Sequence, residues 1–236
     1  MSKTVALFIG HGTSTNGGWD SGCVYGKYTE AGLMKPIAKY AVEYLKKSGV
    51  KVITDYPENN INMVKQVAKS NSTGVSLHVA LHCDYSKAPS GTIPLYTSEK
   101  GKKAAKLMNQ YVMKYVGIKT RGVGRRTDLY ELNATNAPAV IFECGSIKAD
   151  LSKMKNKPKH YGKGIAEGIC KYLGVSFKGD AAAKATKKEV YRVRKTWADA
   201  KSQKGAFSSL SNAKKCADKY NLTVFNNAGK AVYKGK

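Results

Sequence analysis

The stretch Val5-Ala6-Leu7-Phe8-Ile9-Gly10-His11-Gly12 combines an apolar run with a tight turn. The five apolar residues, bounded by β-branched Val5 and Ile9, predict a buried strand. The turn after the strand is so tight that only small residues are expected on both sides of the histidine. The sequence therefore predicts a core strand that delivers His11 to a loop at its carboxyl end.

Strand-like and helix-like segments alternate from this strand onward. Further strands are predicted at residues 50–54, 75–82, 92–96 and 139–142. Helices are predicted at residues 29–48, 61–70, 98–115 and 160–173. Because strands alternate with helices, we expect an α/β fold with a mixed, mostly parallel sheet flanked by helices on both faces.

The composition changes after Val175. Glycine, three consecutive alanines and several lysines predict a linker over residues 176–188, between a first domain at 1–175 and a small module at 189–236. The module is predicted to be α+β with the order β-α-β-β. Its expected features are a strand at 190–195, a helix with Ser211 as candidate N-cap, and strands at 222–225 and 231–233 joined by Asn226-Asn227-Ala228-Gly229.

Basic residues dominate the charge of the chain. It has 236 residues, with 41 Lys and Arg against 16 Asp and Glu, so its formal net charge is +25. Residues 176–236 hold 15 basic and 4 acidic residues, a net charge of +11, and are more than twice as positive per residue as the rest. This surplus predicts a polyanionic partner, and nucleic acid, an anionic membrane surface and an acidic wall polymer all satisfy it.

Other features narrow the class of protein. No apolar run approaches the roughly 18 residues that cross a bilayer, and no signal-peptide pattern precedes the first strand, so we expect a soluble product made in the cytoplasm without membrane insertion. The cysteines are odd in number and scattered, which argues against a disulfide framework or a zinc ribbon. They are Cys23, Cys83, Cys144, Cys170 and Cys216.

Candidate metal ligands follow the predicted strands. His11 and His82 come at the carboxyl ends of two strands, where α/β proteins commonly form sites, and Glu30 opens the first helix. Two histidines and a carboxylate with a free fourth position form the ligand set of hydrolytic zinc sites. Glu143 follows the apolar run 138–142 and is suited to act as a general base beside such a site.

Five blocks of residues, in order, resemble the zinc-dependent N-acetylmuramoyl-L-alanine amidases of phage endolysins and bacterial autolysins, over residues 3–174. The blocks are Ile9-Gly10-His11-Gly12, Asp20-Ser21-Gly22-Cys23, Thr29-Glu30, Ala80-Leu81-His82-Cys83-Asp84 and Pro138-Ala139-Val140-Ile141-Phe142-Glu143-Cys144-Gly145. The resemblance implies the zinc amidase fold, Zn²⁺ held by His11, Glu30 and His82, and Glu143 as the catalytic carboxylate. It also implies cleavage of the amide between the lactyl group of N-acetylmuramic acid and L-alanine of the stem peptide.

Two departures from the family pattern bear on fine specificity. Asp84 stands where this family usually has Asn, and Cys144 and Ser146 flank Gly145 where it usually has a bulky apolar pair. Residues 191–233 resemble the small wall-binding modules of clostridial-type phage endolysins and, more distantly, sporulation-related peptidoglycan-binding repeats. The resemblance implies peptidoglycan and its associated anionic wall polymers as partners, and an enzyme that reaches the wall after release from the cytoplasm.

Several alternatives stay open. His78 shares a strand face with His82 and could be a ligand or an outer group, and Asp20 is a second acidic residue near the first turn. Cys144 with His160 could form a nucleophile and base. A loop with Arg121, Arg125 and Arg126 is either a solvated face or a contact for stem-peptide carboxylates.

Two other functions compete with the amidase. One is a catalytically silent wall- or nucleic-acid-binding protein with the same fold, and the other is a zinc peptidase that cuts within the stem peptide. The aromatic residues among the lysines of the module would suit nucleic acid, but a small module needs them for its own core, so no nucleic-acid partner is expected.

Overall fold

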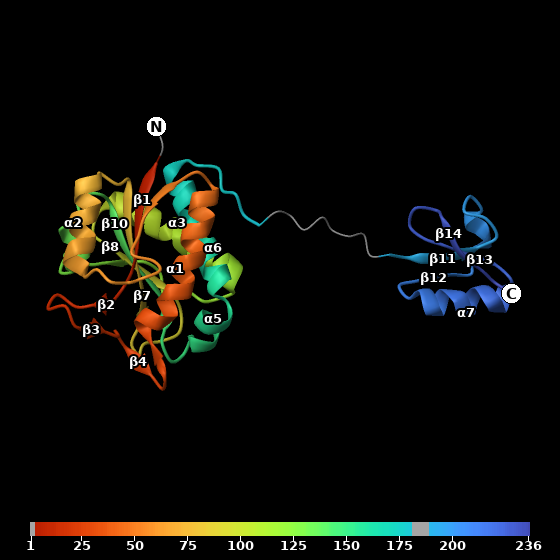
Figure 1. The fold of residues 1–236 in the computed structure, drawn as a ribbon, viewed down its shortest axis with the longest axis horizontal. Helices are drawn as coiled ribbons and strands as arrows, with labels where there is room; N and C mark the ends of the chain where they lie inside the picture. The colour runs from red at the N-terminus through yellow and green to blue at the C-terminus, as the bar shows by residue number, and fades with distance from the viewer. Residues whose placement is uncertain (1–2, 181–188) are drawn as a thin grey trace. The chain divides into compact units, whose positions relative to one another are not determined.

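The structure, a computed structural model, describes residues 3–180 and 189–236 (Figure 1). It contains two compact units, Met1–Gly179 and Asp180–Lys236. Most of the expected linker, residues 181–188, lies outside the described residues. None of the helices in the described part of the chain combines the length and apolar character that crossing a membrane demands.

The first unit is built on a six-stranded sheet in the order β6-β1-β7-β10-β8-β9. Its strands are β1 (Thr4–Ile9), β6 (Lys51–Ile53), β7 (Leu77–Asp84), β8 (Ile93–Tyr96), β9 (Gly124–Arg125) and β10 (Ala139–Ser146). The four strands β6, β1, β7 and β10 run parallel, while β8 runs antiparallel to β10. The predicted mixed, mostly parallel sheet is therefore confirmed.

Helices cover both faces of this sheet (Figure 1). On one face α1 (Glu30–Lys47), α3 (Glu99–Val116) and α6 (Pro158–Leu173) pack over alternate strand residues such as Val5, Leu7 and Ile9. The other face has α2 (Met63–Thr73) and α4 (Tyr130–Asn133), and here Leu132 of α4 packs on Ala80. A short helix, α5 (Leu151–Asn156), precedes α6. The two-residue alternation of each strand thus divides its side chains between two apolar layers.

The strands that bear the site run further than the sequence predicts. β7 continues past His82 to Asp84, and β10 continues past Glu143 to Ser146, so Glu143 lies inside its strand rather than after it. The extension of β10 includes a register shift between Glu143 and Ser146, with Gly145 at φ 135°. Apolar periodicity ends before this irregular segment, which is why the pattern ended the strand too early.

The glycine-rich stretch after His11 is not an unstructured loop. It forms two small antiparallel ribbons, one of β2 (Gly12–Thr13) with β3 (Trp19–Asp20) and one of β4 (Val24–Tyr25) with β5 (Tyr28–Thr29). The second ribbon leads into α1, where Thr29 is the N-cap and its side chain accepts a hydrogen bond from the Gly32 amide at 3.1 Å. The ribbons therefore connect the turn at His11 to the helix that begins with Glu30.

The first unit stays ordered beyond Val175. The Phe177 ring packs 5.8 Å from the Tyr44 ring, and the Lys178 amide donates to Ser48 Oγ at 2.9 Å. The Lys47 ammonium donates to the Gly179 carbonyl at 2.5 Å. These contacts place residues 177–179, the start of the expected linker, on the surface of α1.

The second unit is a four-stranded antiparallel sheet in the order β12-β11-β13-β14 with one helix on it. Its elements are β11 (Tyr191–Arg194), the 3-10 turn Ala200–Ser202, β12 (Gly205–Phe207), α7 (Leu210–Tyr220), β13 (Thr223–Phe225) and β14 (Ala231–Lys234). The predicted order β-α-β-β is therefore wrong by one strand, because the three residues of β12 are too few to show a periodic pattern. The N-cap of α7 is Ser209 rather than Ser211.

Candidate metal centre

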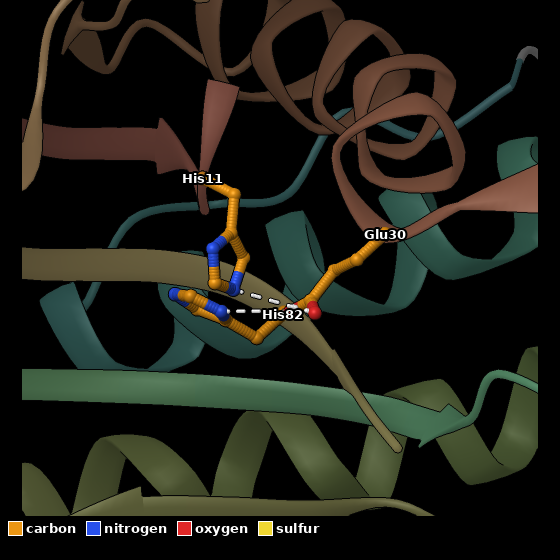
Figure 2. A group of neighbouring side chains, drawn as sticks. All are labelled: His11, Glu30 and His82. Carbon is orange, nitrogen blue, oxygen red and sulfur yellow. Dashed lines mark hydrogen bonds and ion pairs between the residues drawn. The ribbon is translucent and has the colours of Figure 1, made fainter. Parts of the chain in front are cut away.

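The fold brings His11, Glu30 and His82 together at the carboxyl edge of the sheet (Figure 2). β1 and β7 are parallel neighbours with Ile9 opposite Leu81, so the residues that follow these positions meet at one edge. Glu30 Oε2 lies 3.3 Å from His11 Nε2, and Glu30 Oε1 lies 2.8 Å from His82 Nδ1. One ligand atom from each residue falls within 4.8 Å of the others.

Two glycines make room for these side chains. A Cβ added at Gly10 would lie 2.3 Å from the His82 ring, and one added at Gly22 would lie 2.6 Å from the His11 ring and 2.7 Å from Glu30 Oε2. All three distances are far below van der Waals contact, so no larger residue fits without moving one of these side chains. Glycine at both positions is therefore a condition for the three side chains to converge.

Asp20 lies behind His11 rather than in the cluster. Its Oδ2 lies 2.8 Å from His11 Nδ1, and the pairing of β2 with β3 holds it there, since Gly12 is opposite Asp20. The backbone of His11 itself has φ 64°, in the left-handed region. Because the Asp20 carboxylate contacts His11 Nδ1, the other ring nitrogen, Nε2, faces Glu30.

Glu131 takes the corresponding place beside His82, and sequence reasoning missed it. Its Oε2 lies 3.7 Å from His82 Nε2, and its Oε1 lies 3.7 Å from His78 Nε2. Although burial alone would raise it, the interactions with His78 and His82 lower the pKa of Glu131 to about 2, so it is an anion. In the sequence, Glu131 stands out as an acidic residue between Tyr130 and Leu132. However, a helix of four residues is too short for an apolar pattern to show that the Glu131 side chain is buried.

His78 is not part of the cluster. It is fully buried, and its Nδ1 lies 2.8 Å from Ser70 Oγ while Nε2 faces Glu131. Among the alternatives for His78, the structure thus supports an outer group that contacts Glu131. Glu131 in turn contacts His82.

Glu30 is held in its ionised form from several sides. The backbone amides of Cys23 and Cys83 donate to its two oxygens at 3.1 and 3.0 Å. Burial by itself would raise the pKa of Glu30, but hydrogen bonds from His11 and His82 keep it well below the usual range. The carboxylate is therefore fixed in position and charge.

The donor chemistry of this cluster fits Zn²⁺. Two imidazole nitrogens and one carboxylate form the protein ligand set of catalytic zinc sites. The second nitrogen of each histidine faces a carboxylate, Asp20 for His11 and Glu131 for His82, and this arrangement orients metal-binding histidines. Cys23, Glu30 and Cys83 form a second group of close ligand atoms, but it shares Glu30, and the Cys23 contact and burial raise the pKa of the Cys83 thiol.

Glu143 lies on the strand next to the cluster, opposite His82 in the register of β10 and β7. Burial raises the pKa of Glu143 to about 7. Its Oε2 has no hydrogen-bond partner among the described residues. A carboxyl group with a pKa near neutrality can both accept and donate a proton, which general acid–base chemistry needs.

Two pockets meet at His82, Met63 and Glu131. One extends past His11 and is also lined by Thr13, Ser14, Thr15, Asn62 and Gln66. The other contains Glu143 and is lined by Leu95, Arg126, Leu129, Tyr130 and Ile141. The site therefore has one arm on the His11 side and a second arm, with one arginine, on the Glu143 side.

The three arginines of the predicted loop have different surroundings. Arg121 pairs with Asp84 at 2.5 Å and donates to the Gly91 carbonyl at 3.0 Å, so Asp84 is turned toward Arg121. Arg126 lines the pocket of Glu143 and pairs with Asp128 at 2.6 Å. Arg125 is exposed on β9.

The cysteine alternative lacks a usable nucleophile. The Cys144 thiol is fully buried in the layer under α1 and α6, and burial raises its pKa well above the usual value. His160 lies exposed in the first turn of α6. A buried, protonated thiol is inert as a nucleophile.

Comparison with known proteins identifies the family of the chain. The sequence profile of the N-acetylmuramoyl-L-alanine amidases matches residues 5–173. The chain belongs to this family. Among solved structures, an N-acetylmuramoyl-L-alanine amidase from Clostridium difficile 630 is similar with a TM-score of 0.65 and 23% identity, covering 73% of this chain and 97% of that one. The catalytic domain of the CD27L endolysin, which targets Clostridium difficile, is similar with a TM-score of 0.62 and 25% identity, covering 72% and 97%.

Curated relatives of this chain come from Clostridium perfringens. An uncharacterized 38.4 kDa protein is 35% identical over 132 residues, and the uncharacterized protein CPE1502 is 31% identical over 147 residues. These matches cover 51% and 57% of this chain. The chain spans only 38% and 44% of the lengths of these two relatives.

Proposed function

We propose that this chain is a zinc-dependent N-acetylmuramoyl-L-alanine amidase that cleaves the amide between the lactyl group of N-acetylmuramic acid and L-alanine of the stem peptide. The observation that carries the proposal is the convergence of His11, Glu30 and His82 beside the buried carboxyl of Glu143. When bound by the three ligands, zinc supplies a Lewis acid that polarises the scissile carbonyl and acidifies water.

The remaining chemistry falls to the residues of the chain. Asp20 and Glu131 hold protons on the outer nitrogens of His11 and His82, so that His11 Nε2 and His82 Nδ1 face Glu30 and the metal. Glu143 accepts the proton of the attacking water and donates it to the departing amine of L-alanine. Its pKa of about 7 suits both transfers.

The position of Glu143 also orients the substrate. Because this residue protonates the departing amine, the stem peptide extends over the pocket that contains Glu143, Tyr130 and Arg126. The muramoyl sugar then lies over the other pocket, where the Ser14 hydroxyl and the Asn62 amide can bind its polar groups. Arg126 lines the pocket of Glu143, and its guanidinium is held by Asp128.

The second unit is proposed to anchor the enzyme to the wall. Residues 189–236 hold 11 basic and 3 acidic residues, a net charge of +8. A basic module tethered to a catalytic unit raises the effective concentration of the enzyme on an anionic polymer. The likeness of the first unit to the catalytic domain of an endolysin supports a role in host lysis.

One experiment tests the reaction. Purified peptidoglycan is digested with and without a chelator, and the new amine terminus is identified. Free L-alanine amines that appear only without chelator support the amidase. A different amine terminus would establish a peptidase that cuts within the stem peptide, and no new terminus would leave a silent binding protein.

A further inference from the structure

Trp197 of the second unit lies beside two arginines. The Arg194 guanidinium carbon is 5.1 Å from the Trp197 ring centroid, and that of Arg192 is 5.9 Å away. The indole is 37% exposed, although tryptophan in a unit this small is a natural core residue. We refer to Arg192, Arg194 and Trp197 together as the arginine–tryptophan site.

This site lies on the sheet face away from the helix. In β11, Tyr191 and Val193 pack in the core with α7, so the alternate residues Arg192 and Arg194 project from the opposite face. The Trp197 ring lies 6.0 Å from that of Phe225 on the neighbouring strand β13, tilted by 53°. A Cβ at Gly229 would lie 2.7 Å from the indole nitrogen, so the hairpin after β13 approaches the ring closely. Trp197 is thus held by its neighbours and is still partly exposed.

Both guanidinium groups are held by neutral acceptors. Arg194 Nε donates to Gln203 Oε1 at 2.9 Å, and its NH1 donates to the Trp197 carbonyl at 2.8 Å. Arg192 NH1 donates to Asn227 Oδ1 at 3.1 Å and to the Val190 carbonyl at 3.3 Å. These bonds fix the arginine side chains through neutral groups, and the Glu189 carboxylate accepts from the Asn227 backbone amide rather than from a guanidinium.

The contrast with the first unit is direct. Arg121 and Arg126 each pair with an aspartate at 2.5 and 2.6 Å. Within the described residues, no carboxylate lies within ion-pair distance of Arg192 or Arg194. Arginine forks held in place bind phosphate and carboxylate groups in a bidentate way, and an indole face packs against the apolar side of a sugar ring.

We propose that the arginine–tryptophan site binds a wall polymer whose sugar rings carry phosphodiesters, with a ring over Trp197 and phosphates on Arg192 and Arg194. The choice of polymer rests on the proposed wall-lytic function. In peptidoglycan that has not been cut, the lactyl carboxyl groups are in amide linkage and therefore neutral. The phosphodiesters of its accessory polymers then supply the anions that this proposal places next to a sugar ring.

The unit offers a matched control. Tyr220 is 45% exposed and has Lys204 and Lys219 at 5.7 and 5.3 Å from its ring centroid. This second aromatic and basic group has the same charge as the arginine–tryptophan site. Its charges, however, are ammonium groups on flexible lysine side chains instead of planar guanidinium groups. Replacing either pair by glutamine removes two positive charges from the same unit.

The experiment measures binding of the full chain to purified, soluble wall teichoic acid by titration calorimetry. For Arg192→Gln with Arg194→Gln we expect a loss of affinity of roughly tenfold or more, because charge-assisted hydrogen bonds are lost. Lys204→Gln with Lys219→Gln should lose only about two- to threefold through general electrostatics. Arg192→Lys with Arg194→Lys, which keeps the charge, should still lose most of the affinity.

Several outcomes would overturn the site or its ligand. If the arginine-to-glutamine and lysine-to-glutamine double variants lost affinity equally, binding would rest on nonspecific electrostatic attraction. If Arg192→Gln with Arg194→Gln left the affinity unchanged, the arginine–tryptophan site would not be the binding site. Tighter binding to peptide-free glycan or to a DNA oligonucleotide than to teichoic acid would reject the phosphodiester wall polymer. Hydrolysis of a soluble muramoyl-peptide is measured in parallel. Binding without hydrolysis would contradict the proposed function while leaving this site standing.

Discussion

The two units of the chain handle charge in opposite ways. At the candidate metal centre, Glu30, Asp20 and Glu131 face the imidazoles of His11 and His82, and the positions of these groups are set by short contacts in a partly buried site. In the second unit, Arg192 and Arg194 are fixed by neutral acceptors at the surface. The first arrangement fixes geometry for a bound ion and a reaction, whereas the second leaves charge available to a partner.

The largest expected effect comes from Gly10→Ala. The new Cβ would lie 2.3 Å from the His82 ring, so the ring has to leave its position beside Glu30. We expect loss of zinc binding and of amidase activity, measured by elemental analysis and by release of L-alanine amines. Gly18→Ala, in the loop between β2 and β3 where the nearest atom is 3.3 Å away, is the control and should retain both. Binding of walls by the second unit should survive in both variants, and zinc retained in Gly10→Ala would contradict the steric argument.

Glu143→Gln separates chemistry from metal binding. The amide has the size of the carboxyl group but cannot transfer a proton, so turnover should fall by about 10² to 10⁴-fold. Zinc content should stay unchanged, because Glu143 is not among the three grouped ligands. Steady-state kinetics on a soluble muramoyl-peptide, with zinc quantified in the same preparation, provide the test. Normal turnover in this variant would remove Glu143 from its proposed role.

The convergence of the candidate ligands was predictable because it depends on simple rules. Strand ends of a parallel sheet meet at one edge, so apolar runs followed by His11 or His82 already indicate where the side chains go. Glu30 at a helix start added a third candidate ligand. Glu131 could not be found in this way, since its place between His78 and His82 depends on the tertiary packing of a single helical turn.

The second unit shows a similar limit. Its main strands and its helix follow from periodicity, but β12 has only three residues, and Ser209 and Ser211 are equally good capping residues by type. Composition alone could not show which aromatic residues of the module, Trp197 among them, lie in its core. The position of Trp197 beside Arg192 and Arg194 depends on the pairing of β11 with β13, which no local pattern reveals.

Glu131→Gln tests whether the outer carboxylate matters to the metal site. Removing the charge that faces His82 Nε2 should weaken zinc affinity or activity by about 10- to 100-fold, as is typical of outer partners of metal-binding histidines. Zinc affinity is measured by competition with a chromophoric chelator. Glu99→Gln, at an exposed ion pair with Lys102 in the first turn of α3, is the matched control and should leave affinity unchanged. If both variants bound zinc as tightly as the unmodified chain, Glu131 would have only a packing role.

The smallest expected effect is the response to salt, and it tests the division of charge between the two units. Raising ionic strength from low to physiological values shortens the Debye length to about 8 Å and screens exposed charges, while short contacts inside a partly buried site are screened much less. Lysis of whole cells should therefore weaken several-fold, because it depends on the exposed charge of residues 189–236. Hydrolysis of a small soluble muramoyl-peptide, which needs only the metal centre and its two pockets, should change little. If both activities fell in parallel, the net charge of +8 on the second unit would have no separate part in holding the enzyme on the wall.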